Sequence, residues 1–188
     1  MLISADVKSL EVVSAAYLSN DKVLCEEVRS GTDFHAINQE RFNLPNRTVA
    51  KIFKFKLIYG ATAYGYAHDS DFISVSRSQD FWQGIIDEYY NKYQGIRLWH
   101  RNLVEVALRR GLYTSPTGRT YIYPCKDVAD RQWFWRPKIL NYPVQGLGAD
   151  LVMLARISFW SLLKQWGIKA LPVSSVHDSI VVDVDTSA

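Results

Sequence analysis

Two cations and two aromatic residues follow one another at intervals of four: Arg47, Lys51, Phe55 and Tyr59. On a helix, residues four apart share one face, so these four would form a slanting stripe about 18 Å long. Guanidinium and ammonium groups bind phosphates, and aromatic rings pack against sugars and bases. The stripe could therefore hold a nucleoside triphosphate lengthwise. An amphipathic helix with buried aromatic residues and solvated cations shows the same spacing, so that interpretation stays open.

The segment around the stripe is also rich in positive charge. Residues 41–56 contain five Lys or Arg and no Asp or Glu. This predicts a strongly positive local field, which a phosphate-bearing ligand would favour.

Two aspartates, Asp6 and Asp178, each stand at the end of a strand-like apolar run. Metal-assisted phosphoryl transfer needs carboxylates that bridge two Mg²⁺ ions about 3.5–4 Å apart. One ion activates a hydroxyl group, and the other neutralises the leaving phosphates. Asp178 also fits a turn-forming aspartate. Asp6 is harder to explain in this way, because an acid that ends a buried strand usually has a function.

Asn141 and Gln145 lie one helical turn apart, and Arg119 precedes them on a predicted hairpin. Amides and a cation on one face suit hydrogen bonds to the backbone and minor-groove atoms of a nucleic-acid duplex. Helix capping or surface polarity would explain each of them equally well in isolation.

The periodicity and the turn signals predict a mixture of helices and short strands. Proline at the start of a helix, glycine at a break and Pro-Thr-Gly at a turn set most of the boundaries. We expect strands at 2–7, 173–176 and 180–184, a hairpin at 113–124 turning at 116–118, and helices at 10–20, from about 34, at 47–60, at 61–66, at 79–110 with an interruption at Gly95, and at 141–165.

Composition indicates an ordinary folded chain of 188 residues, with 48% hydrophobic and 22% charged residues. The net charge of +3 leaves any nucleic-acid preference to local clusters. Cys25 and Cys125 form no metal-binding spacing, which predicts buried free thiols in a reducing compartment. Asp6 and Lys8 interrupt the early apolar run, and the apolar stretch 151–163 is short for a bilayer, so we expect a cytoplasmic protein with no membrane partner.

In their order along the chain, these residues resemble the family A (Pol I-type) DNA polymerases. Asp6-Val7-Lys8-Ser9-Leu10-Glu11 resembles motif A of that family, usually Asp-Tyr-Ser-Gln-Ile-Glu. The stripe with Gly60 resembles motif B, the O helix of the fingers, and 176–178 resembles motif C. Segments 33–35, 93–96, 117–124 and 141–146 resemble lesser landmarks of the family, so that the similarity covers essentially the whole chain.

The resemblance implies an α+β fold, namely the right-hand polymerase palm with a small antiparallel sheet and a helical fingers insertion. The palm would comprise 1–14 and 134–188, the fingers would comprise 15–133 with the O-helix-like segment 47–60, and the thumb and exonuclease domains would be absent. It implies a DNA-directed DNA polymerase of a bacterial or phage-infected cell. In the reaction that this implies, the 3′-oxygen of the primer would attack the α-phosphate of the dNTP in line.

The resemblance also implies a role for each matching residue. Asp6 and Asp178 would bind two Mg²⁺ ions, with the Val7 carbonyl as a further ligand. Arg47, Lys51 and His35 would hold the triphosphate, and Lys51 would donate a proton to pyrophosphate. Phe55 would pack on the sugar, Glu11 would exclude a 2′-hydroxyl, and Tyr59 would guard the templating position. The primer terminus or the minor groove would contact His177, Arg119, Asn141 and Gln145.

The chain departs from the family pattern in sequence and in extent. Val7, Lys8 and Ser9 replace the usual Tyr-Ser-Gln, and Ser179 replaces a frequent glutamate, which affects fine geometry and fidelity rather than metal binding. Motif A begins six residues from the start, so we expect a split-gene subunit or a fragment. A partner chain would supply the thumb and the rest of the palm, or the chain would self-associate.

Two alternatives remain. A relative of the single-subunit RNA polymerases would share the His-Asp-Ser sequence at 177–179, although that family lacks an acidic gate at Glu11 and an aromatic residue at Phe55. A noncatalytic subunit that binds primer–template would keep the basic stripe and its aromatic residues without turnover.

Overall fold

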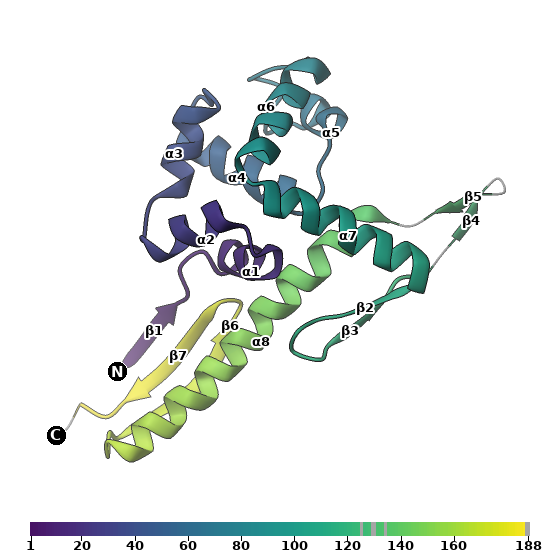
Figure 1. The fold of residues 1–188 in the computed structure, drawn as a ribbon. Helices are drawn as coiled ribbons and strands as arrows, with labels where there is room; N and C mark the ends of the chain where they lie inside the picture. Colours follow the sequence, from purple (N-terminus) through teal and green to yellow (C-terminus); the bar gives the residue numbers. More distant parts are fainter. Residues whose placement is uncertain (125, 129–130, 134, 187–188) are drawn as a thin grey trace.

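The first and last strands of the chain pair with each other. The computed structural model describes residues 1–124, 126–128, 131–133 and 135–186. In it, β1 (Leu2–Asp6) lies antiparallel to β7 (Ser179–Val184), and β6 (Ala170–Val176) lies on the other side of β7. The N-terminal amine donates a hydrogen bond of 2.8 Å to the Val184 carbonyl, so the two ends of the chain lie side by side (Figure 1). The expected small antiparallel sheet is present.

The long helix α8 (Arg136–Gln165) runs along one face of this sheet (Figure 1). Alternate residues of β7 face it and are buried, because side chains of a strand point to opposite faces in turn. The small core between helix and sheet consists of Leu10, Val152, Leu163, Ile180 and Val182. All five residues of β1 are exposed, so the expectation that Asp6 ends a buried strand was wrong, and one edge of the sheet is open.

The other end of the molecule is helical. Its elements are α1 (Leu10–Ser19), α2 (Lys22–Arg29), α3 (Phe34–Arg41), α4 (Arg47–Ile58), α5 (Ala63–His68), α6 (Gln79–Lys92) and α7 (Gln94–Arg110). Its core is aromatic: the Tyr66 ring lies 4.9 Å from that of Phe53 and 5.3 Å from that of Trp82, between ring centroids. The Tyr66 hydroxyl donates a hydrogen bond to the Phe53 carbonyl, so the polar end of this buried ring is satisfied. This core holds α4 in place.

Side-chain caps fix where the helices that carry predicted site residues begin. The Asn46 side chain accepts a hydrogen bond from the Val49 amide, and α4 accordingly begins at Arg47, as predicted. The Asp33 carboxylate caps α3 in the same way. Asp21 caps α2, a helix that the polar composition of residues 22–29 did not predict.

Several predicted boundaries were wrong, and the strand expected at 173–176 begins at Ala170. The helix at 79–110 breaks at Tyr93 rather than Gly95, and Gly95 lies in the first turn of α7. A side chain at Gly95 would approach the Asp21 backbone to 2.6 Å, so this glycine permits a close contact and does not interrupt the helix. The last long helix begins at Arg136 instead of 141. Pro137 fits its first turn, because backbone N–H groups at that position make no hydrogen bond within the helix.

Two hairpins follow α7. The predicted one consists of β2 (Leu112–Thr114) and β3 (Thr120–Ile122), and it packs on α8 at Gly146, where any side chain would overlap the Tyr121 hydroxyl. The other, β4 (Lys126–Val128) and β5 (Arg131–Trp133), was not predicted. Cys25 is a half-buried free thiol that donates to the Ala16 carbonyl, and Cys125 lies outside the described residues.

Candidate active site

The sheet brings Asp6 and Asp178 to the same end of neighbouring strands. Asp6 lies opposite Ser179 in the β1–β7 register, and the Val7 amide donates a hydrogen bond of 3.0 Å to the Asp178 carbonyl. Asp178 occupies the turn between β6 and β7, where the preceding His177 has a positive φ of 54°. Residues 172 positions apart are therefore neighbours, as the two-carboxylate hypothesis requires.

A cleft of about 470 Å³ lies beside this carboxylate pair. It is lined by Leu10, Glu11, Val144, Gln145, Gly148, Ala149, His177 and Asp178. Four of these were predicted site residues, Asp178 and Gln145 from their chemistry and Glu11 and His177 from the family resemblance, and they come from α1, α8 and the β6–β7 turn. Residues from three separate parts of the sequence thus converge on one concave surface.

The carboxylates of Asp6 and Asp178 have the chemistry that Mg²⁺ requires. Neither accepts a hydrogen bond or ion pair from any residue that the structure describes, so their oxygens are available as ligands. Among those same residues, no group of three or more His, Cys, Asp or Glu could hold a metal. Mg²⁺ is commonly bound through one or two carboxylates, with water and substrate phosphates completing its shell. The donor set fits that mode of binding and does not fit a closed, all-protein metal site.

The Tyr59 end of the stripe reaches this cleft. Tyr59 follows the last residue of α4, and its hydroxyl accepts a hydrogen bond of 2.5 Å from the Gln145 side-chain amide. Burial, with the nearby Glu11 carboxylate, raises the pKa of Tyr59 to about 12, so the phenol stays neutral at physiological pH. The stripe on α4 and the cleft are therefore parts of one continuous surface.

The opposite end of the stripe is held by a carboxylate. Arg47 Nε donates to Asp33 Oδ2 at 2.8 Å, and Arg47 Nη2 donates to Asp33 Oδ1 at 3.3 Å. Hydrogen bonding to this guanidinium lowers the pKa of Asp33, although burial opposes the shift. Asp33 is thus ionised at neutral pH and ties the start of α4 to the start of α3.

His35 lies in the first turn of α3, against the stripe. Its side chain is 4% exposed, and its ring lies 5.8 Å from that of Phe55. Burial lowers its pKa to about 4, and the charges of Lys54 and Arg47 contribute to the shift. His35 is therefore neutral at pH 7, and it would contribute a hydrogen bond rather than a charge.

The prediction of a strongly positive field around the stripe was wrong, because most of its cations have partners. Arg41 pairs with Glu88, Arg47 with Asp33, and Lys56 with both Asp69 and Asp71. Lys54 is fully buried, with Nζ 4.1 Å from the centre of the Phe34 ring, and burial lowers its pKa to about 7. Exposed Lys51 has no carboxylate partner among the described residues, and its Nζ lies 5.8 Å from the Phe55 ring.

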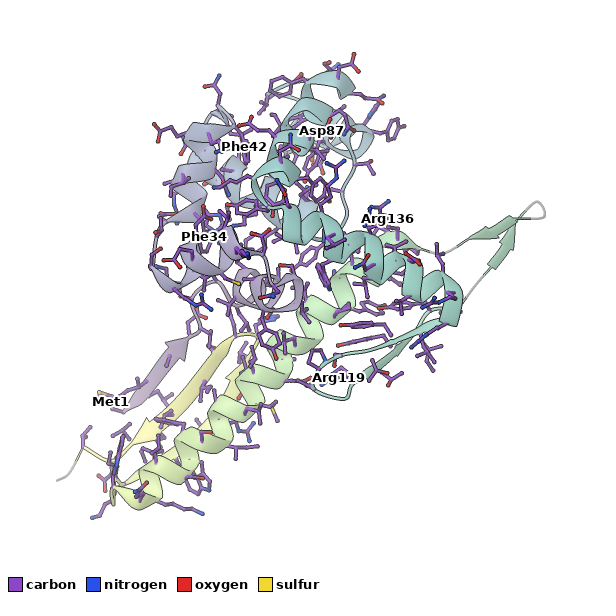
Figure 2. The ribbon with its side chains drawn as sticks, viewed as in Figure 1. Met1, Phe34, Phe42, Asp87, Arg119 and Arg136 are labelled. Carbon is purple, nitrogen blue, oxygen red and sulfur yellow. The ribbon has the colours of Figure 1, made fainter. Side chains whose placement is uncertain are left out.

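No hydrogen bond among the described residues joins Arg119, Asn141 and Gln145, although the Arg119 side chain passes close to Gly146, which follows Gln145. Arg119 extends from the β2–β3 hairpin toward α8, where it pairs with Asp150 (Figure 2). The Asp150 carboxylate also accepts a hydrogen bond from Thr117 at 2.6 Å. The carbonyl oxygen of the Asn141 side chain is buried without a partner among the described residues. Sequence reasoning missed Asp150, because nothing near it in sequence identifies a partner 31 residues away.

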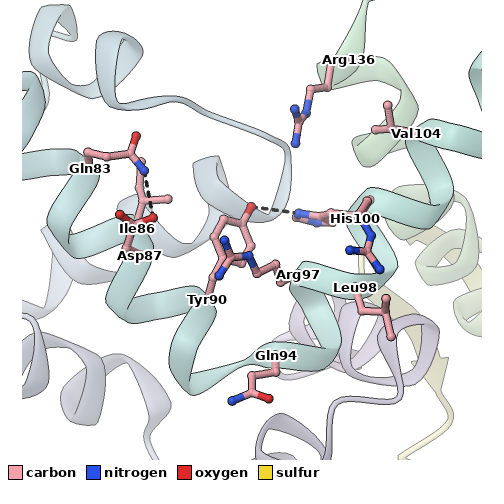
Figure 3. Close-up of a pocket in the computed structure, with 11 residues that line it drawn as sticks. Gln83, Ile86, Asp87, Tyr90, Gln94, Arg97, Leu98, His100, Val104 and Arg136 are labelled. Carbon is pink, nitrogen blue, oxygen red and sulfur yellow. Dashed lines mark hydrogen bonds between the residues drawn. The ribbon is translucent and has the colours of Figure 1, made fainter.

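A second cavity of about 470 Å³ contains none of the predicted site residues. It lies where α6, α7 and the start of α8 meet, and its lining includes Arg97, Arg101 and Arg136 (Figure 3). The Tyr90 hydroxyl and His100 Nδ1 are hydrogen-bonded at 3.0 Å within it. It is therefore separate from the cleft beside Asp178.

Comparison with known proteins agrees with the order of motifs along the chain. The family model described as DNA polymerase family A matches residues 1–188. DNA polymerase I of Pseudomonas aeruginosa is 31% identical over 194 residues, and DNA polymerase I of Mycobacterium leprae is 28% identical over 193 residues. Each alignment covers 97% of this chain and 21% of the relative, so the chain spans about a fifth of the length of these proteins.

A solved structure is similar over nearly the entire chain. It is the POL domain of Pol1 from M. smegmatis in complex with DNA primer-template and dNTP, with a TM-score of 0.83 and 26% sequence identity. The similarity covers 99% of this chain and 34% of that one. The mixed architecture of helices and a small antiparallel sheet is thus that of a family A polymerase domain. The chain belongs to DNA polymerase family A.

Proposed function

We propose that the chain is the catalytic part of a template-directed DNA polymerase, which transfers a nucleotide from a dNTP to a primer 3′-hydroxyl. The observation that carries the proposal is the convergence of Glu11, Gln145, His177 and Asp178 on one cleft. Asp6 lies opposite Ser179, the residue after Asp178, and Tyr59 is hydrogen-bonded to Gln145 of the cleft lining. The solved POL domain that resembles it is a complex with primer-template and dNTP.

The carboxylate pair would bind the catalytic metal ions. Asp6 and Asp178, with the backbone carbonyl of Val7, would hold two Mg²⁺ ions through hard oxygen ligands. When bound, the ions supply activation of the attacking hydroxyl and neutralisation of charge on the phosphates. Both side chains are free of competing protein partners among the described residues, which leaves their oxygens available for this task.

The α4 stripe would bind the incoming nucleotide. Arg47, Lys51 and neutral His35 would hold the triphosphate, and Lys51 would protonate the departing pyrophosphate. Lys51 suits this role because its ammonium is exposed and has no carboxylate partner among the described residues. Phe55, half-buried beside His35, would pack on the sugar.

Two residues of the cleft would select the nucleotide. Glu11 would lie against the sugar and exclude a 2′-hydroxyl, both by its size and by the cost of leaving its carboxylate poorly solvated. Tyr59, fixed by Gln145, would occupy the templating position until a template base replaces it. An acidic gate in the cleft favours dNTP over rNTP substrates and therefore a DNA polymerase over an RNA polymerase.

Polar residues around the cleft would contact the primer and template. His177 and Gln145 line it directly, and Asn141 lies one turn earlier on α8. Arg119 uses Nε and Nη2 for Asp150, which leaves its remaining N–H groups for acceptors on the duplex. These contacts position a duplex without reading much of its sequence.

The sheet and α8 carry many exposed apolar side chains. They include Leu2, Ile3, Met153, Leu154, Ile157, Leu171 and Val173. Exposed apolar residues in such number are typical of surfaces that pack against another polypeptide. We propose that this surface contacts the thumb and the rest of the palm, supplied by a partner chain or by other segments, or a second copy of the chain.

The helix α8 is long and apolar enough to cross a membrane, by length and composition alone. The predicted apolar stretch 151–163 lies within its 30 residues. We interpret α8 as part of the polymerase fold, because the family match extends through it. With bacterial proteins as relatives, we propose the cytoplasm of a bacterial or phage-infected cell as the site of action.

The test is primer extension by the purified chain with Mg²⁺ and dNTPs, with Asp178→Ala beside the wild type. We expect the substitution to reduce extension by about 1,000-fold or more, because one of the two metal-binding carboxylates is lost. Asp183→Ala is the matched control, since Asp183 lies near the far end of β7, the strand that begins directly after Asp178. Extension that survives in Asp178→Ala would contradict the metal site. Binding of primer–template without any extension would instead favour the noncatalytic subunit.

A further inference from the structure

One carboxylate organises the first turns of both helices that flank the proposed triphosphate site. Asp33 Oδ1 accepts hydrogen bonds of 3.1 Å from the backbone amides of His35 and Ala36. The same oxygen and its neighbour accept from the Arg47 guanidinium at 3.3 and 2.8 Å. Four N–H donors, two from α3 and two from the first residue of α4, therefore meet at one side chain.

The Asp33–Arg47 pair is side-on, and that geometry decides which part of the guanidinium remains free. Nε and one N–H of Nη2 point at the carboxylate, so three of the five N–H groups are left. Because the guanidinium is planar, fixing one edge also fixes the direction of the other. Arg47 thus presents a second, oriented edge to a ligand while its first edge is held.

Stability does not account for this contact. The side chains of Arg47 and Asp33 are 55% and 48% exposed, and ion pairs at such exposure contribute little to folding. A cap at α3 needs no charge either, because asparagine caps a helix about as well as aspartate. Orientation of Arg47 is the effect that only the charged, two-oxygen carboxylate provides.

We infer that Asp33 is a positioning residue, which holds Arg47 and His35 in the arrangement that receives the triphosphate of a dNTP. The inference rests on the proposed function, because it takes the α4 stripe as the nucleotide site. It makes a prediction opposite to simple electrostatics. A carboxylate near phosphate groups repels them, so removal of its charge alone would tighten binding, whereas loss of a positioning contact weakens it.

The experiment is a double-substitution cycle with two readouts. Asp33→Asn, Arg47→Ala and the double variant are compared with the wild type for the dissociation constant of inorganic triphosphate, by calorimetry. The KM for dNTP and kcat are measured in primer extension. Glu88→Gln is the matched control, since it removes one carboxylate charge from another exposed arginine pair in the same helical region, with Arg41. Thermal unfolding confirms that each variant is folded.

We expect Asp33→Asn to weaken triphosphate binding by about tenfold and to raise KM by a similar factor, with a smaller effect on kcat. The double variant should bind no more weakly than Arg47→Ala, because Asp33 acts through Arg47. Glu88→Gln should match the wild type. Unchanged or tighter binding in Asp33→Asn, or additive losses in the double variant, would overturn the inference.

These outcomes separate the inference from the proposed function. Asp33-dependent triphosphate binding without primer extension would support the inference and count against the polymerase activity of the chain. Primer extension that is unchanged in Asp33→Asn would contradict the inference and support the polymerase activity of the chain. A wild-type chain that neither binds triphosphate nor extends a primer would overturn both.

Discussion

The Tyr59 hydroxyl and the Gln145 amide, 86 positions apart in the sequence, are joined by a hydrogen bond of 2.5 Å. This contact links the end of α4 to α8, and so places the Tyr59 end of the stripe beside the cleft that Asp178 lines. It also places an aromatic ring at the position proposed for the template base.

Tyr59→Ala should therefore reduce fidelity more than activity. Removal of the ring opens space beside the templating position, and we expect misincorporation to rise by about tenfold, a loss of roughly 1.4 kcal/mol in discrimination. Tyr59→Phe keeps the ring and should stay near the wild-type error rate. Single-nucleotide incorporation of correct and incorrect dNTPs measures both. Tyr64→Ala, at an exposed tyrosine of α5, is the control, and equal error rates in Tyr59→Ala and wild type would contradict the assignment.

Glu11 should decide between deoxyribose and ribose. We expect Glu11→Ala to raise the efficiency of rNTP use relative to dNTP use by about 100-fold, because the side chain that excludes a 2′-hydroxyl is gone. The ratio of kcat/KM for the two nucleotides is the measurement. Glu26→Ala, at an exposed acid of α2, should leave the ratio unchanged. A wild-type chain that prefers rNTP would indicate an RNA polymerase relative instead.

Lys54 should make the helical region more stable as the pH rises above 7. Burial lowers its pKa from 10.5 to about 7 in the folded chain, so between these values the unfolded chain binds more protons. The free energy of unfolding should then increase with pH across this window. Lys54→Met should remove that slope and stabilise the protein at pH 7 by on the order of 3 kcal/mol. Urea unfolding at pH 7 and 9 tests this, with exposed Lys51→Met as the control.

His100 should have an effect of the same sign at lower pH. Burial, with Arg136 nearby, lowers its pKa to about 3, whereas the unfolded value is near 6.5. Protons therefore bind the unfolded chain preferentially between these values, and stability should fall as the pH drops below about 6.5. The slope should be shallower in His100→Gln, while His68→Gln, at an exposed histidine, should retain it. Denaturant midpoints at pH 7 and 5 provide the comparison.

Local patterns predicted the elements well, because caps, glycines and prolines act on their own neighbours. Asn46 marks the start of α4, and the Pro-Thr-Gly turn marks the β2–β3 hairpin. The interruption at Gly95 failed for a tertiary reason, since that glycine makes room for Asp21, 74 positions away. The periodicity of the sequence does not reveal contacts between residues so far apart.

The candidate site, too, could be predicted in its local features but not in its long-range contacts. Residue types and the family resemblance identified the candidate residues, but not which cations would be neutralised. Each neutralising carboxylate lies on a different segment from the arginine or lysine with which it pairs. These carboxylates are Glu88, Asp33, Asp69 and Asp71. Only the folded arrangement reveals that Lys51 stands without a carboxylate partner among the described residues.

The pairing of β1 with β7 has a consequence for the order in which the protein assembles. Closing a loop of this length carries a larger entropic penalty than any local contact, and the helices between the two strands form from contacts much nearer in sequence. During synthesis, a nascent chain can build its aromatic helical core before β7 exists. Asp6 and Asp178 become neighbours only after that, so the metal site proposed for them would form last.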